Sequence, residues 1–308
     1  MLRRLLFAGA GAAVLGLAGF WLLTEPATVH TAALGPHTPD LANGRTMFLA
    51  GDCAACHATP LQKNPDRLGG GLGLVSKFGT FYAPNISADV KDGVGGWTEA
   101  QFVTAVTKGT SPEGEHFYPI FPYASFQRMK TEDVRDLFAY IKTLPAVAGR
   151  APRNEVPFPF NIRRGVGLWK LLYLDGKTYR TDGSKSAQWN RGAYLVNGPE
   201  PCAECHSPRN ALGAIAAKKR FSGNPIGFAK GGFPNITTLE WSRDDWERLL
   251  ETGVTAKGDP VGRVGGPMVE VVRSTAQLSP EDRAAMAEYL VSLRPVAIVA
   301  PAPAPRPG

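Results

Sequence analysis

The sequence predicts an all-α protein in which two tandem helical domains follow an N-terminal transmembrane helix. Three observations support this prediction. A run of 19 residues without a charge extends from Leu5 to Leu23. The two halves of the remaining chain carry the same short motifs in the same order, and each half closes on an amphipathic stretch with helix-start signals. At 308 residues the chain is long enough for two small domains with separate cores.

The N-terminal segment, residues 1–24, is interpreted as a membrane anchor. Arg3 and Arg4 precede the apolar run and would stay on the cytoplasmic side, which places the rest of the chain on the periplasmic side of a bacterial cytoplasmic membrane. A cleaved signal peptide is the alternative. Its apolar core is usually about 7–15 residues long, and no clear small-x-small site directly follows Leu23. A retained anchor is therefore favoured, with residues 25–39 as a linker.

Two C-x-x-C-H motifs use every cysteine in the chain. Two thiols three residues apart on one helical turn can add to the two vinyl groups of a haem, and the adjacent histidine can bind the iron. A thioredoxin-like pair would need a βαβ context, and a four-cysteine zinc site would have to join pairs 146 residues apart. The sequence therefore predicts two covalently bound haem c groups. Their predicted attachment residues are Cys53, Cys56, His57, Cys202, Cys205 and His206.

The halves match beyond these motifs. A Pro-Asn-Ile string follows each histidine, beginning at Pro84 and at Pro234. A tryptophan comes next in each half, and a glycine lies 12 residues after it. The carbonyls of Pro84 and Pro234 are candidates to accept a hydrogen bond from the two imidazoles, which would fix their tautomer. The tryptophan and glycine pairs are Trp97 with Gly109 and Trp241 with Gly253.

Each half ends with a predicted helix, over 134–144 and 280–293. Thr131 and Ser279 are the expected N-caps, and Pro280 suits a first helical position. A first helix, a haem motif, a middle helix, a ligand loop and a last helix are the plan of a class I cytochrome c domain. The predicted organisation is cytochrome c domain 1 at 40–145, a basic aromatic connector at 146–185, cytochrome c domain 2 at 186–295 and a disordered Pro/Ala-rich tail at 296–308.

The second axial ligand of each iron must come from elsewhere in the chain. Met47 and Met286 fall within expected helices and are interpreted as core residues. Met129 and Met268 each precede a last helix, Met268 in a Gly-rich loop, so they are the predicted distal ligands. His116 is the main rival in the first domain, and His30 and His37 are weaker candidates.

Charge is unevenly distributed along the chain, whose net formal charge is +7. From Ala146 to Gly231 there are 14 Lys or Arg residues against 5 Asp or Glu residues. Such a surface could steer an acidic partner or lie against anionic lipid, and an ordinary solvated surface is an equal alternative. No nucleic-acid partner is expected on the periplasmic side of a membrane.

Several strings resemble the multihaem cytochrome c subunits of membrane-bound bacterial dehydrogenases, such as those for alcohol and gluconate. The resemblance covers roughly 43–293, although the best-known members carry three haem motifs and some have Met where Phe121 stands here. It implies an electron-transfer subunit that accepts electrons from a partner dehydrogenase and passes them to the respiratory chain, through quinone or a terminal oxidase. The alternatives are a dihaem subunit of a haem-copper oxidase and a dihaem enzyme such as a peroxidase. The strings are Phe78–Ile86, Trp97-Thr98, Tyr118–Tyr123, Trp189–Val196, Cys205–Asn210 and Met268–Val272.

Overall fold

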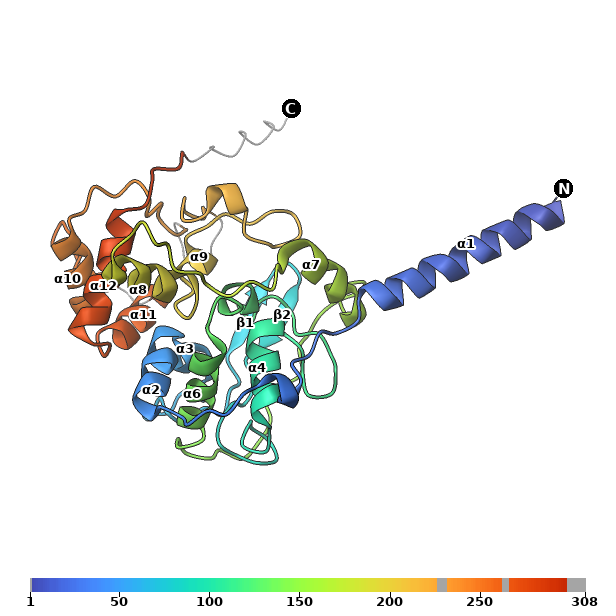
Figure 1. Cartoon of the computed structure of the whole chain (residues 1–308), viewed down its shortest axis with the longest axis horizontal. Coiled ribbons are helices and arrows are strands. Elements are labelled where there is room, and N and C mark those ends of the chain that lie inside the picture. Colours follow the sequence, from blue (N-terminus) through green and yellow to red (C-terminus); the bar gives the residue numbers. More distant parts are fainter. Residues whose placement is uncertain (1, 226–231, 262–265, 298–308) are drawn as a thin grey trace. The chain divides into compact units, whose positions relative to one another are not determined.

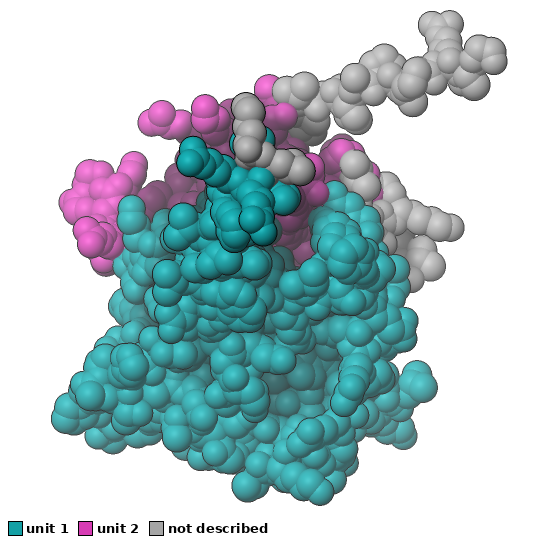
Figure 2. Space-filling model, turned by 90° about the vertical axis from the view of Figure 1, so that its right-hand side faces the viewer, with its two compact units in different colours: residues 1–179 teal, residues 180–308 magenta. Residues whose placement is uncertain are grey.

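The computed structural model describes residues 2–225, 232–261 and 266–297. The chain forms two compact units, residues 1–179 and 180–308 (Figure 2). Most of the predicted connector belongs to the first unit. The described part is mostly helical, as predicted. The predicted tail falls almost entirely outside the described residues.

Unit 1 begins with the apolar helix α1 (Leu2–Leu23), which extends away from the rest of the unit (Figure 1). The apolar stretch of this helix, within Arg3–Leu23, is not buried by the rest of the chain. Its length and composition are those of a helix that can cross a membrane. A short 3-10 turn, η1 (Thr31–Ala33), follows it. These features are consistent with the predicted anchor.

The core of unit 1 is built by α2 (Leu41–Ala50), α4 (Glu99–Lys108) and α6 (Thr131–Ile141). The α2 and α6 helices pack closely because Gly44 has no side chain where it meets the backbone of α6. The short helices α3 (Cys53–His57) and α5 (Tyr123–Phe126) lie between these longer elements in the sequence. Lys130, rather than the predicted Thr131, occupies the N-cap of α6, and its side chain makes no capping hydrogen bond.

A β-hairpin departs from the predicted all-α class. Strands β1 (Gly73–Ser76) and β2 (Gly79–Tyr82) pair antiparallel. Thr80 in β2 also exchanges backbone hydrogen bonds with Glu155, at 3.0 and 2.8 Å. The connector thus supplies a third segment beside the hairpin, and this long-range pairing is not visible in a helical periodicity.

The connector also forms a helix that the sequence analysis did not assign. A 3-10 turn, η2 (Arg163–Gly165), leads into α7 (Val166–Tyr173). The α7 helix contacts the C-terminal end of α1, near which it lies in Figure 1. The connector therefore packs on unit 1 through α7 and through the pairing of Glu155 with Thr80.

Unit 2 repeats the helical order of unit 1. Its first helix, α8 (Ala187–Asn197), packs on its last, α12 (Pro280–Val291), and Gly192 allows the close approach just as Gly44 does in unit 1. Ser279 caps α12 as predicted, since its hydroxyl accepts from the Asp282 amide. The remaining elements are α9 (Cys202–Cys205), η3 (Ala217–Lys219), α10 (Arg243–Thr252) and α11 (Pro267–Thr275).

Candidate haem-binding sites

The first C-x-x-C-H motif forms the single turn of α3. Cys53 and Cys56 are three residues apart on this turn, so their thiols lie on one side of it. Neither cysteine is in a disulfide. Burial, together with the nearby Asp52 carboxylate, raises the pKa of Cys56 to about 11. Among the described residues, no group of three or more His, Cys, Asp and Glu side chains is placed to hold a zinc ion.

His57, the last residue of α3, is oriented by a backbone carbonyl. Its Nδ1 lies 2.8 Å from the carbonyl oxygen of Pro84, which can only accept, so Nδ1 carries the proton. Burial lowers the pKa of His57, and this outweighs the opposite effect of the hydrogen bond. The neutral ring therefore keeps its lone pair on Nε2, the atom that an iron would bind. The contact confirms the predicted role of the Pro84 carbonyl.

A glycine holds the Pro84 segment against the motif. The Gly70 amide donates to the carbonyl of His57 at 2.8 Å, and Gly70 has a φ of +69°. A Cβ at this position would lie 2.5 Å from the carbonyl carbon of Pro84. Only glycine permits both the left-handed backbone and this close approach.

Asn85 ties the same loop to the chain that leaves α6. Its side-chain amide donates to the carbonyls of Val147 and Gly149, at 2.6 and 2.8 Å. Its Oδ1 accepts from the Ser87 amide at 2.9 Å. The histidine, the proline carbonyl and the segment that follows α6 are thereby joined in one hydrogen-bonded frame.

Unit 2 builds the same frame on α9. His206 Nδ1 lies 2.9 Å from the Pro234 carbonyl, and burial lowers the pKa of His206. The amide of Gly223, with a φ of +86°, donates to the His206 carbonyl at 2.8 Å. Asn235 donates to the Val296 carbonyl at 2.9 Å. The glycine and asparagine roles escaped the sequence analysis, although the repeated Pro-Asn-Ile string was their signal.

Burial raises the pKa of one thiol of unit 2 as well. The pKa of Cys202 is raised well above its ordinary value by burial and by the Glu200 carboxylate. Neither Cys202 nor Cys205 is in a disulfide. Each unit thus combines two cysteines three residues apart on one helical turn with a neutral, oriented imidazole.

Met268 lies in a helix rather than in the predicted loop. It is the second residue of α11, behind Pro267, and is half-buried. The sequence pattern suggested a loop because Gly266 precedes it, but Pro267 is well suited to a first helical position. Gly265 of that predicted loop lies outside the described residues.

Met129 is 2% exposed and occupies the residue before the N-cap of α6. Leu278 occupies the same place before α12 and is 4% exposed. Both amides donate back to the carbonyl three residues earlier, on Phe126 and on Thr275. Met129 therefore corresponds to a leucine in the repeat, and not to Met268.

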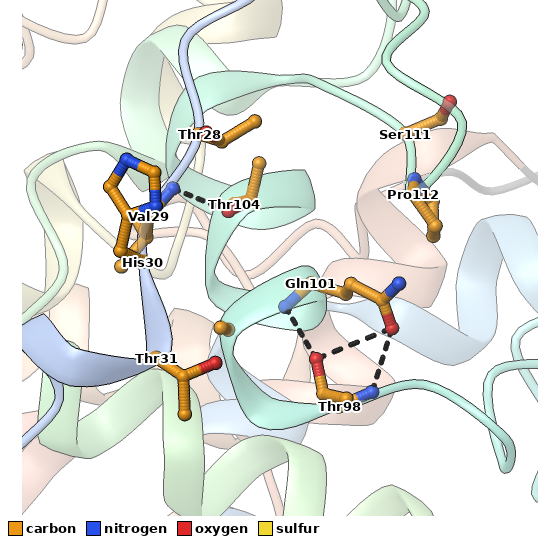
Figure 3. A pocket seen from close by; sticks show the side chains of 10 residues that line it. Thr28, Val29, His30, Thr31, Thr98, Gln101, Thr104, Ser111 and Pro112 are labelled. Atoms are coloured by element: carbon orange, nitrogen blue, oxygen red, sulfur yellow. Dashed lines mark hydrogen bonds between the residues drawn. The ribbon is translucent and has the colours of Figure 1, made fainter.

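Two of the three candidate histidines, His116 and His37, make side-chain hydrogen bonds of their own. His116 is 2% exposed and its Nε2 lies 2.8 Å from the Thr24 carbonyl. His37 Nε2 lies 2.6 Å from Asp136 Oδ1. His30 lines a pocket between the η1 region and α4, where Gln101 and Thr98 form a capping box (Figure 3). This pocket contains no residue of either C-x-x-C-H motif.

Comparisons with known proteins agree with this geometry. The profile of the cytochrome c family matches residues 41–145. A diheme cytochrome c-type protein of Cereibacter sphaeroides is 42% identical over 94% of this chain and 98% of its own length. The fructose dehydrogenase cytochrome subunit of Gluconobacter japonicus is 36% identical over 94% of this chain and 60% of its length. The gluconate 2-dehydrogenase cytochrome c subunit of Pantoea cypripedii is 32% identical over 81% and 58%. This chain thus spans less than two thirds of these two dehydrogenase subunits.

Proposed function

The chain belongs to the family of dihaem c-type cytochromes and carries two covalently bound haem c groups, and on this premise we propose that it is the membrane-anchored electron-transfer subunit of a periplasmic dehydrogenase system. The observation that carries the proposal is the frame found once in each unit, in which a cysteine pair, a neutral histidine and a proline carbonyl are held together. The relatives include cytochrome subunits of dehydrogenases, and for this reason we propose a dehydrogenase as the electron donor.

The attachment residues follow from the two motifs. Cys53 and Cys56 would form the thioether bonds of the first haem, with His57 as its axial ligand. Cys202, Cys205 and His206 would do the same in unit 2. The hydrogen bonds from Nδ1 to Pro84 and Pro234 leave Nε2 of each ring as the ligand atom and increase its basicity.

The distal side sets much of the reduction potential, and a methionine sulfur raises it relative to a histidine nitrogen. We assign Met268 as the distal ligand of the second haem. Met129 is the methionine candidate for the first haem, and its match with Leu278 gives it a packing role as the alternative. Replacing Met129 and Met268 by leucine, one at a time, tests whether each methionine binds a haem iron or only packs in the core.

The α1 helix would hold the two units on the periplasmic face of a bacterial cytoplasmic membrane. Tethering keeps a carrier at high effective concentration beside its membrane partners. Electrons would enter one haem from the docked dehydrogenase, pass to the other, and leave to quinone or to a terminal oxidase, directly or through another cytochrome. The chain itself would bind no organic substrate.

The test is affinity purification of the tagged full chain from gently solubilised native membranes. We expect a dehydrogenase to co-purify, and its substrate to reduce both haems, as followed by absorbance. A matched preparation with Cys202→Ser and Cys205→Ser, which retains one haem, should show half the amplitude. Co-purification of haem-copper oxidase subunits instead, or failure of the dehydrogenase substrate to reduce either haem, would overturn the proposal.

A further inference from the structure

Large apolar side chains are exposed in one short stretch of the connector. Outside α1, twelve such side chains are exposed among the described residues, and six of them fall between residues 158 and 172. We propose that this stretch, Phe158–Tyr173, is a second membrane contact that lies in the interfacial region of a lipid bilayer beside the α1 span. The proposal rests on the proposed anchoring by α1. The six residues are Phe158, Phe160, Ile162, Leu168, Leu171 and Leu172.

The α7 helix presents a continuous apolar face. Leu168, Leu171 and Leu172 have the i, i+3, i+4 spacing of one helix face and are 44%, 55% and 67% exposed. Trp169 and Lys170 lie on the opposite side of the helix, where the Trp169 ring centre is 6.0 Å from that of Tyr123 and Nζ of Lys170 donates to the Gly109 carbonyl at 2.6 Å. The helix is therefore packed on unit 1 by this side, and its leucine side faces outward.

Contacts fix α7 to the end of the α1 helix. Nε of Arg164 donates to Oγ1 of Thr24 at 2.9 Å, and its guanidinium carbon lies 4.6 Å from the centre of the Trp21 ring. Arg164 also donates to the Trp21 carbonyl. Thr24 is the residue directly after α1. If α1 spans the bilayer, α7 is held where the span leaves the hydrocarbon, and its leucine face must lie at that depth.

The composition around this face is typical of an interfacial helix. Residues 150–180 contain seven Lys or Arg residues against two acidic residues. Basic and aromatic groups prefer the headgroup region, where Trp21 would also lie. The leucine side chains could contact lipid acyl chains, and the basic residues around them could contact anionic headgroups. A surface that faces water rarely exposes so many large apolar side chains together. A bilayer therefore accounts for the apolar face, the charge and the position beside α1 together.

The experiment measures thiol reactivity in the full haem-loaded chain, reconstituted in nanodiscs of zwitterionic and anionic lipid. All four native cysteines are consumed by haem attachment in the proposed function, so an introduced cysteine is the reactive thiol. Leu171→Cys and Leu172→Cys are compared with Leu41→Cys and Val75→Cys, which have matched exposures of 49% and 68% in the same unit. Leu15→Cys tests whether α1 itself lies within the bilayer. Haem content and the visible spectrum confirm that each variant folds.

We expect a charged maleimide to modify the two α7 cysteines at least about tenfold more slowly than their controls, since apolar surroundings exclude the reagent and raise the thiol pKa by a unit or more. Rates equal to the controls, with Leu15→Cys protected, would overturn the interfacial contact and leave the anchor intact. A reactive Leu15→Cys would instead overturn the anchoring on which the proposal rests. The chain is alone in the nanodisc, so a partner protein cannot cause the protection.

Discussion

The close approach of α2 and α6 makes Gly44→Ala a sensitive test of how unit 1 is held together. A Cβ at Gly44 would lie 2.7 Å from the carbonyl carbon of Asp136 and 2.8 Å from Cβ of Tyr140, and it would overlap the Asp136 carbonyl oxygen. Ordinary contacts of a Cβ begin near 3.4 Å, so the helices must separate. Overpacking of this kind costs about 1–3 kcal/mol or more, and alanine regains about 1 kcal/mol through its helix propensity. Because the overlap is with helix backbone, we take the upper end of that cost, about 3 kcal/mol, and expect a net loss of about 2 kcal/mol.

Hydrogen exchange followed by mass spectrometry localises this loss to the helices concerned. A drop of about 2 kcal/mol corresponds to a roughly 30-fold faster exchange of amides that open with α2 and α6. Peptides from unit 2 provide an internal reference, and Gly35→Ala, where an added Cβ has open space, is the matched control. Unchanged exchange in α2 and α6 of the Gly44→Ala chain would refute the packing argument.

Two further predictions concern ligation and pH. Met268→Leu should lower the potential of one haem, because a thioether ligand is lost, as measured by redox titration. Met129→Leu preserves the volume of the side chain. If this exchange lowers the potential of the other haem, Met129 is a ligand. If both potentials are unchanged and the free energy of unfolding changes by less than about 1.5 kcal/mol, Met129 is a packing residue. Burial lowers the pKa of Lys170 to about 7, whereas the unfolded chain keeps that proton to about pH 10.4. The folded state then binds fewer protons between these values, so the free energy of unfolding of unit 1 should rise by up to a few kcal/mol from pH 7 to 10. Lys170→Met should abolish the rise seen in pH-dependent denaturation, and an identical rise in both chains would contradict this assignment.

The features repeated in the sequence were the ones that could be predicted. The C-x-x-C-H strings, the Pro-Asn-Ile strings and the glycines after each tryptophan recur because each serves a local geometric need. Gly109 and Gly253, for example, end α4 and α10 in the left-handed conformation, with φ of 60° and 73°. The hydrogen bonds to the Pro84 and Pro234 carbonyls could be expected for the same reason.

Features that depend on distant partners could not be predicted in this way. The β1–β2 hairpin is completed by Glu155, some seventy residues along the chain. The α7 helix has only eight residues and is packed on unit 1 by Gly167 against Thr24. Such short elements take their stability from tertiary contacts rather than from their own periodicity.

The two predicted distal ligands, Met129 and Met268, do not occupy equivalent positions in the two units. Met129 follows Gly109 by 20 residues, whereas Leu278 follows Gly253 by 25. The five extra residues of unit 2 fall within the stretch that contains α11 and Met268. The histidine sides of the two sites therefore share the same hydrogen-bond partners, a proline carbonyl and a left-handed glycine, while the stretches before the last helices differ in length. Because the distal side tunes the reduction potential, we expect the two haems to differ in potential, which would give electron transfer between them a direction.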